Sequence, residues 1–173
     1  MRQNQSLHRL VAAALFAGAI TIMTAYILHI PIPTGGYVHL GDALIYLAAC
    51  LLPLPYAAAA AAIGAGLADL LTAPMWVLPT LLIKALVVLP FTARHDRLLC
   101  PRNALAVVVS GLLSPALYAL ANVIMTGTWA AFLPQFLGTL VQAVGSGAVF
   151  LVLALALDKV GLKSRLAPQL HGA

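Results

Sequence analysis

The sequence contains very little charge. Only 8% of its 173 residues are charged, with nine Lys or Arg against four Asp or Glu, while 63% are hydrophobic and the mean hydropathy is +1.04. A soluble domain carries roughly 25% charged residues, so this chain lacks the polar side chains needed to cover a surface that faces water. The composition therefore predicts an integral membrane protein, with the lipid bilayer as its surroundings.

Other features that the sequence lacks exclude further classes of function. The two cysteines, Cys50 and Cys100, have no neighbours at metal-ligand spacing, so we expect neither a disulfide nor a metal site. The chain has no GxxxxGK[ST] phosphate-binding loop. Its basic residues are not interleaved with aromatic ones, so its pI near 9.6 does not indicate nucleic-acid binding. We expect no cofactor, and any ATP-derived energy must come from other chains.

What the sequence does contain is long apolar runs that do not alternate as barrel strands would. Breaks at Pro, Gly and charge clusters leave segments near the length that a transmembrane helix needs. The predicted helices are 9–29, 39–54, 56–73, 75–93, 103–126 and 130–157. The fold class is therefore all-α, an integral membrane bundle of six transmembrane helices in one domain over residues 1–173. The first run is long enough to span, so we expect it to be retained rather than cleaved as a signal peptide.

The basic residues set the orientation of this bundle. Apart from Lys84, they precede the first helix, separate the fourth from the fifth, or follow the sixth. The loops at 30–38, 73–75 and 127–129 contain no Lys or Arg. Under the positive-inside rule the basic side is cytoplasmic, so both termini are predicted to face the cytoplasm.

Polar side chains within the helices gather in the half predicted to face outside. A charge at the centre of a membrane helix costs about 2.5–3.5 kcal/mol on insertion scales, so such residues mark pairing or function. Residues spaced three or four apart share one helix face, and three polar stripes have that spacing: Trp76, Thr80 and Lys84; Ser114, Tyr118 and Asn122; Gln135, Thr139, Gln142 and Ser146. The stripes predict a pocket open to the outside. The alternative is that these residues only pair with one another, for example Lys84 with Asp69.

The stretch PIPTGGYVHLGDALIY (31–46) joins the first two predicted helices on that outer side. Gly35 and Gly36 give the loop a backbone that can bend and approach a ligand closely. Asp42 falls in the first turn of its helix, where the positive end of the dipole favours a carboxylate. It is therefore either a structural cap or a ligand contact, and Tyr37 and His39 are stronger candidates for contacting substrate.

The first helix carries a face of small residues. Ala13 and Ala17, and likewise Ala14 and Gly18, are small-xxx-small pairs that allow another helix to approach closely. That face serves either packing within the bundle or docking of an outside partner.

These motifs resemble those of the substrate-binding S components of energy-coupling factor (ECF) vitamin transporters. The resemblance rests on the Ala13-xxx-Ala17 face and on three segments: GGYVHLGDALIYLAACLLP (35–53), AAIGAGLADLL (61–71) and PTLLIKALV (79–87). Their order is most similar to the branch for hydroxymethylpyrimidine, pyridoxine-like or pantothenate-like substrates. The resemblance spans essentially the whole chain, with its specific motifs confined to residues 13–87.

The resemblance implies a subunit that binds a small vitamin or precursor from outside and does no chemistry on it. It implies a transmembrane coupling protein and two ATPase subunits as partners, in the plasma membrane of a prokaryotic-type cell. It also implies that Ala13 and Ala17 contact the coupling protein and that the loop with Gly35 and Gly36 gates the pocket. The outer half is poor in aromatic residues, which favours a small ring or small polar acid over a flavin- or folate-sized substrate. The candidate substrate-binding residues are Tyr37, His39, Asp42, Asp69, Trp76, Thr80, Lys84, Tyr118, Asn122, Gln135 and Gln142.

Two other functions are weighed against this one. A self-contained small-molecule transporter would need no coupling protein. An intramembrane aspartyl enzyme would use Asp42 and Asp69 as its acid pair, but HLGD lacks the first glycine of the GxGD motif and both acids lie near the outer surface. We therefore predict no catalytic residues.

Overall fold

The computed structural model describes residues 2–27, 29–31 and 37–170, and this part of the chain is almost entirely helical. The only strands described are a short antiparallel pair in which Ile30 faces Val38 and Pro31 faces Tyr37. The elements in chain order are α1 (Arg2–Ala25), β1 (Ile30–Pro31), β2 (Tyr37–Val38), α2 (Asp42–Leu51), α3 (Leu54–Thr72), the 3₁₀ turn η1 (Pro74–Trp76), α4 (Val77–Val87), α5 (Pro101–Thr126), the 3₁₀ turn η2 (Trp129–Ala131), α6 (Phe132–Lys159) and α7 (Leu162–Leu170). The all-α prediction is confirmed.

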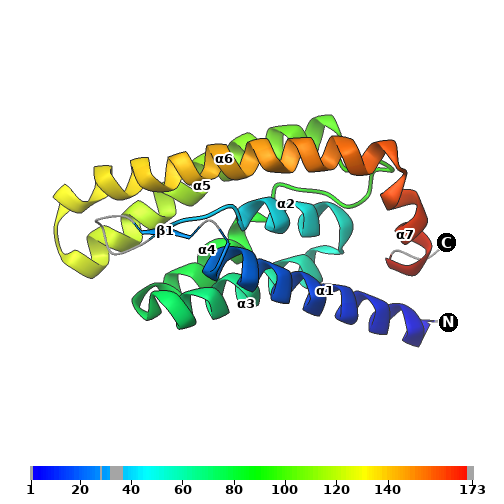
Figure 1. Ribbon diagram of the computed structural model, residues 1–173, viewed down its shortest axis with the longest axis horizontal. Coiled ribbons are helices and arrows are strands. Elements are labelled where there is room, and N and C mark those ends of the chain that lie inside the picture. The colour runs from blue at the N-terminus through cyan, green and yellow to red at the C-terminus, as the bar shows by residue number, and fades with distance from the viewer. Residues whose placement is uncertain (1, 28, 32–36, 171–173) are drawn as a thin grey trace.

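The helices form an elongated bundle (Figure 1). The long helices α5 and α6 run antiparallel along one side, joined by a turn at Gly127, whose φ of 71° is one that glycine adopts readily. Helices α1 and α3 pack together along the opposite side, and α2 lies between the two pairs. Both described ends of the chain lie at the same end of the bundle, where the Arg9 side chain donates to the Leu170 carbonyl oxygen at 2.6 Å.

Each predicted segment contains a helix, but the lengths differ from the prediction. Among the described residues, four helices are long and apolar enough to cross a membrane: Asn4–Ala25, Leu54–Thr72, Pro101–Thr126 and Trp129–Lys159. Helix α2 has only ten residues, a rise of about 15 Å against a hydrocarbon core of about 30 Å. Pro53 helps end it early, because the residue before a proline is pushed into an extended conformation, as Leu52 is. The apolar helical segment Pro74–Val87 is likewise short. The number of crossings therefore stays a prediction.

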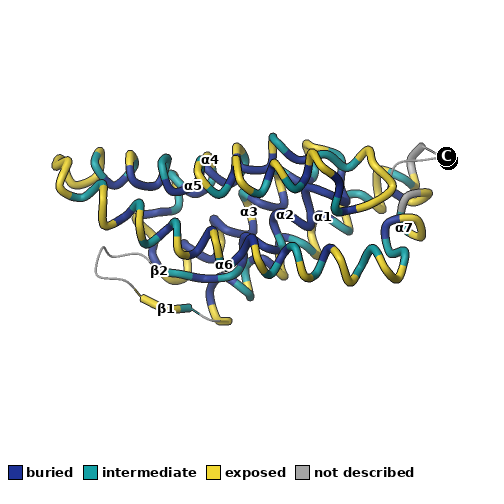
Figure 2. The backbone as a smooth tube through the Cα atoms, turned by 90° about the horizontal axis from the view of Figure 1, so that it is seen from above, coloured by how far each residue is buried: buried dark blue, intermediate teal, exposed yellow. Residues whose placement is uncertain are grey.

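The bundle buries a core of small, aliphatic and aromatic side chains and leaves many other large aliphatic side chains exposed. Tyr46 stacks on Phe91 at 4.9 Å between ring centroids and meets Phe150 edge-on at 5.8 Å. Large aliphatic residues face outward on several helices, among them Leu78 on α4 and Ile124 on α5. Figure 2 shows this division, with buried positions on the inward sides of the helices and exposed positions on their outward sides. An apolar outer surface of this kind is typical of helices that face lipid.

Helices α1 and α3 approach closely because both are lined with small residues. A Cβ added to Gly64 would lie 2.7 Å from the carbonyl oxygen of Ala17, so only glycine fits there without a shift of backbone. The Thr21 hydroxyl donates to the Gly64 carbonyl oxygen at 2.9 Å across the same contact. The small-residue face of the first helix therefore packs, in part, within the bundle.

Candidate functional site

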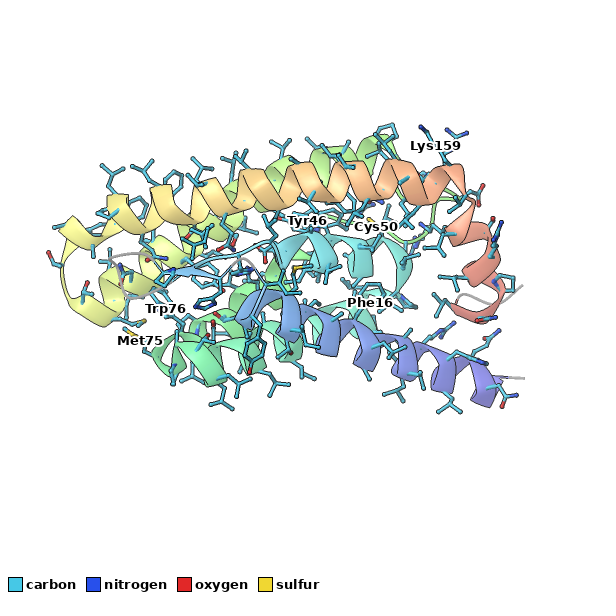
Figure 3. The ribbon with its side chains drawn as sticks, viewed as in Figure 1. Phe16, Tyr46, Cys50, Met75, Trp76 and Lys159 are labelled. Carbon is cyan, nitrogen blue, oxygen red and sulfur yellow. The ribbon has the colours of Figure 1, made fainter. Side chains whose placement is uncertain are left out.

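The polar stripes predicted on three helices converge inside the bundle. The ten candidate residues with described side chains are all at most 9% exposed: His39, Asp42, Asp69, Trp76, Thr80, Lys84, Tyr118, Asn122, Gln135 and Gln142. One of them, Trp76, lies in the half of the bundle away from the chain ends, whereas Lys159 lies at the opposite end (Figure 3). Polar groups buried this deeply must be paired or must face a cavity.

A small cavity lies where these stripes meet. Its volume is about 40 Å³, and its described wall consists of His39, Asp69, Trp76, Tyr118, Gln135, Thr139 and Gln142. These residues come from the entry to α2, from α3, η1, α5 and α6. Six of them are among the candidates from the sequence, and Thr139 belongs to the predicted α6 stripe. As it stands, the cavity has room for little more than a water molecule or two.

Behind this wall lies a buried ion pair. The Lys84 ammonium contacts Asp42 Oδ1 at 2.6 Å, and both side chains are 1% exposed. Gln142 Nε2 donates to the other carboxylate oxygen of Asp42 at 3.0 Å. Lys84 is therefore paired with Asp42 and not, as the alternative interpretation had it, with Asp69.

The ion pair also explains Asp42 itself. Asp42 lies in the first turn of α2, as the sequence predicts, but Gly41 occupies the N-cap position and no side chain of the described residues caps the helix there. The carboxylate of Asp42 is directed to Lys84 and Gln142 instead. Its role is to balance a buried lysine and to position an amide of the cavity wall.

Tyr118 links the wall to the stripe on α4. Its hydroxyl group shares a hydrogen bond of 2.7 Å with Thr80, and the Lys84 ammonium lies 5.2 Å from the centroid of its ring, within cation–π range. The rings of Trp76 and Tyr118 are 5.8 Å apart and tilted by 59°. Thr80 and Lys84 therefore hold one of the two aromatic walls in place without lining the cavity themselves.

His39 is held in one tautomer. The backbone N–H of Gly41 donates to its Nδ1 at 3.0 Å, so Nδ1 carries no proton and the neutral ring is protonated at Nε2. The Ser146 hydroxyl donates to the carbonyl oxygen of His39 at 3.4 Å, which anchors this turn to α6. The residue enters the site as a hydrogen-bond donor through Nε2.

Two polar atoms on the wall have no hydrogen-bond partner among the described residues: Trp76 Nε1 and Gln135 Oε1. The amide nitrogen of Gln135 donates to the Thr139 hydroxyl at 3.2 Å, so only its oxygen is unsatisfied. An unsatisfied buried polar atom costs about 1–3 kcal/mol. Trp76 and Gln135, which both line the cavity, therefore each keep one polar atom without a partner among the described residues.

The remaining candidates lie away from the cavity wall or have side chains outside the described residues. Asn122 is off the cavity wall and donates to the Ala131 carbonyl oxygen at 3.3 Å, which joins α5 to η2. Tyr37 has a described backbone in β2, but its side chain lies outside the described residues, as do Gly35 and Gly36. Sequence reasoning missed Thr24, a fully buried threonine whose hydroxyl packs against Gly41; a single threonine in an apolar run gives no signal.

A second feature lies on the outside of the bundle. Ala13 and Ala17 are 8% and 9% exposed because they pack toward α3, and they line an apolar groove of about 620 Å³ between α1 and α3. Ala14 and Gly18 line the same groove from its exposed side. Within the described residues, no three His, Cys, Asp or Glu side chains gather where they could hold a metal ion.

The chain matches a known protein family. A family model for the ECF-type riboflavin transporter, S component, matches residues 4–159. The matched range includes every element that lines the cavity and the groove, and it ends before α7. A comparison with curated proteins gives no match.

Proposed function

The chain belongs to the family of ECF-type riboflavin transporter S components, and on that premise we propose that it captures a small vitamin or vitamin precursor from outside the cell. It delivers this substrate inward together with a transmembrane coupling protein and two ATPase subunits. Members of the family are membrane substrate-binding subunits of ECF transporters and not enzymes. The observation that carries the proposal is the convergence on one cavity of buried polar side chains from α3, η1, α5, α6 and the segment before α2.

The proposed orientation places both termini in the cytoplasm of a prokaryotic-type cell, with the cavity in the outer half of the plasma membrane. The Lys and Arg residues in the first turns of α1, in and beside the segment between α4 and α5, and at and beyond the end of α6 support this orientation. The two described chain ends lie together (Figure 1), as an even number of crossings requires.

The substrate we propose is a single ring or a molecule of similar size: the pyrimidine of thiamine, a pyridoxine-like compound or a pantothenate-like compound. The family is named for riboflavin, which has three fused rings. A cavity of about 40 Å³ must widen to enclose any vitamin, and it must widen least for a single ring, since sites that enclose drug-sized ligands have roughly 300–1,000 Å³. Its two aromatic residues, tilted against each other by 59°, also do not form the parallel walls that would sandwich a flat three-ring system.

An uptake assay tests the proposal. Cells that express the chain alone, or with a coupling protein and two ATPases, are supplied with radiolabelled vitamins. We expect accumulation only when all components are present and only with ATPases that hydrolyse ATP. Accumulation by the chain alone would instead support the second candidate, a self-contained transporter.

We propose the groove beside Ala13 and Ala17 as the surface that docks the coupling protein. Tryptophan at Ala13 or Ala17 would disturb the packing on α3, because both are nearly buried. Ala14→Trp and Gly18→Trp are cleaner, since both positions are exposed and a Cβ at Gly18 meets nothing within 4 Å. We expect both variants to bind substrate but to lose co-purification with the coupling protein. Val152→Trp, at a 68% exposed position on α6, is the matched control; equal loss in the control would remove the groove from the docking role.

The aspartyl enzyme remains the weakest alternative. Only Asp69 of the proposed acid pair lies on the described cavity wall, while both oxygens of Asp42 are occupied by Lys84 and Gln142. An acid held in this way is not available to exchange protons with a partner acid across a substrate.

A further inference from the structure

A groove that combines apolar and positively charged residues lies apart from the cavity. It has a volume of about 460 Å³ and is lined by the end of α2, the start of α3, the segment after α4 and the start of α5. We name it the arginine groove, after Arg94 and Arg102 in its wall. We propose that it binds an anionic phospholipid, with the two arginines on the headgroup phosphate and the apolar residues of the groove against the adjoining glycerol and acyl chains. The proposal goes beyond the proposed function and does not depend on it, since it requires only that the bundle is surrounded by lipid.

The charge of the arginine groove is the first argument. Arg94 and Arg102 line it, and no acidic residue is among its described lining residues. Both arginines are exposed, and neither forms an ion pair within the described residues. The carboxylate of Asp158, on α6, accepts instead from the backbone N–H groups of Leu98 and Leu99 at 2.7 and 2.9 Å. Two guanidinium groups without an anion favour a ligand phosphate, to which arginine can donate two parallel hydrogen bonds.

The second argument is that both arginines are held on one framework. Arg102 Nε donates to the Pro90 carbonyl oxygen at 3.2 Å, which leaves its Nη groups for a ligand. The next residue, Asn103, is fully buried. Its side chain accepts from the Thr92 N–H at 2.9 Å and donates to the Thr92 carbonyl oxygen at 3.0 Å. The backbone N–H of Arg94 donates to the Thr92 hydroxyl at 3.3 Å. The segment that carries Arg94 is therefore fixed to the helix that carries Arg102, and a ligand does not have to order it.

The apolar residues of the arginine groove supply the third argument. Leu54 and Leu89 line it and are each 48% exposed, while Leu52 and Phe91 are buried beneath. A free phosphate would leave this apolar surface uncovered, and an apolar partner would leave the guanidinium groups without an anion. An amphiphile with a phosphate at its polar end covers both, because its apolar chains bury the leucine side chains.

The position of the arginine groove fits the same ligand. The segment between α4 and α5 runs toward the end of the bundle where the chain ends lie (Figure 1). That end is the one predicted to face the cytoplasm. The cytoplasmic leaflet of a membrane carries anionic lipids, and basic pockets between helices on that side bind their headgroups. The groove therefore lies at the depth where headgroup and acyl chain meet.

Binding of radiolabelled phosphatidylglycerol to the purified chain in detergent micelles tests the proposal. The unlabelled competitors are phosphatidylglycerol, phosphatidylcholine with the same acyl chains, and inorganic phosphate. We expect saturable binding that phosphatidylglycerol displaces at least about tenfold more effectively than phosphatidylcholine, and that inorganic phosphate displaces little. Arg94→Gln and Arg102→Gln should each weaken binding about fivefold, the contribution typical of one basic side chain near a membrane surface. Arg97→Gln is the matched control, because Arg97 is an exposed arginine of the same segment that does not line the groove, and it should leave binding within about twofold.

Four outcomes would overturn the proposal. An equal loss in Arg97→Gln would show diffuse attraction by the whole basic segment. Equal displacement by phosphatidylcholine would show that the headgroup is not recognised, and displacement by inorganic phosphate as effective as by phosphatidylglycerol would show that the lipid chains are not. Variants of Arg94 and Arg102 that bind lipid normally but no longer co-purify with the coupling protein would assign the groove to an acidic segment of that protein. Absence of coupled uptake, measured separately, would refute the proposed function and leave the lipid site as it stands.

Discussion

The buried pair of Asp42 and Lys84 gives the sharpest test of how the bundle is held together. We consider Lys84→Met, Asp42→Asn and the double variant that combines them. Methionine keeps the length of the lysine side chain, and asparagine keeps an oxygen that accepts from Gln142 Nε2. Each single change leaves the other charge inside a bundle where both side chains are 1% exposed.

The expected magnitudes follow from that burial. Removal of one partner of a buried ion pair leaves an uncompensated charge and costs about 3–5 kcal/mol, whereas replacement of both partners by neutral groups of similar size is often close to neutral. Each single variant should therefore lower the free energy of unfolding by about 3–5 kcal/mol, and the double variant by much less than the sum. The excess over additivity measures the coupling between the two residues.

Unfolding is measured by titration of the purified proteins with SDS in mixed micelles, with dye labelling of the buried cysteines Cys50 and Cys100 as the readout. The reasoning is refuted if each single variant costs less than about 1 kcal/mol. It is also refuted if the cost of the double variant equals the sum of the two singles, since the charges would then not depend on each other.

Two further predictions concern packing and loop anchoring. Gly64→Ala should destabilise the bundle by about 1–3 kcal/mol, because its Cβ would lie 2.7 Å from the Ala17 carbonyl oxygen. Gly18→Ala is the control and should not destabilise the bundle, because its Cβ would meet nothing within 4 Å. Equal unfolding free energies for the two variants would contradict the close α1–α3 contact. Asn103→Leu should cost about 3 kcal/mol, because the Asn103 side chain accepts from Thr92 N and donates to the Thr92 and Leu98 carbonyl oxygens. Limited proteolysis should then cut between residues 92 and 100 faster than in the unchanged protein, and an unchanged cleavage rate would show that the asparagine does not anchor this segment.

Composition and residue spacing predicted the helical fold and the convergence of the polar stripes, because both depend on many residues together and not on single contacts. The apolar excess required helices, and the positions of Pro and charged residues separated them. The stripes on η1–α4, α5 and α6 predicted convergence because side chains three and four residues apart share a face whatever surrounds the helix. All ten of the candidates with described side chains are indeed buried, and six of them share the cavity wall.

The partners of individual polar groups could not be predicted in this way. Lys84 lies 15 positions from Asp69 and 42 from Asp42, and neither separation indicates which acid it meets. Which acid pairs with Lys84 depends on the position of the first turn of α2 within the bundle. That position is set by the short length of α2 and by its packing against α6. Asn122 belongs to a correct stripe but serves the turn at η2, because it lies one helical turn beyond the cavity.

The short length of α2 is what makes a polar site possible in so apolar a chain. A helix that crossed the whole bilayer would place its first turn at the surface, where water satisfies the free N–H groups. Helix α2 begins instead at a residue that is 1% exposed, so its positive dipole end lies inside the bundle and favours a buried carboxylate there. Asp42 supplies that carboxylate, Lys84 balances it, and Gln142 completes its hydrogen bonds. Gln142 also lines the cavity. The interactions that stabilise the buried start of α2 therefore also position part of the wall on which a ligand would bind.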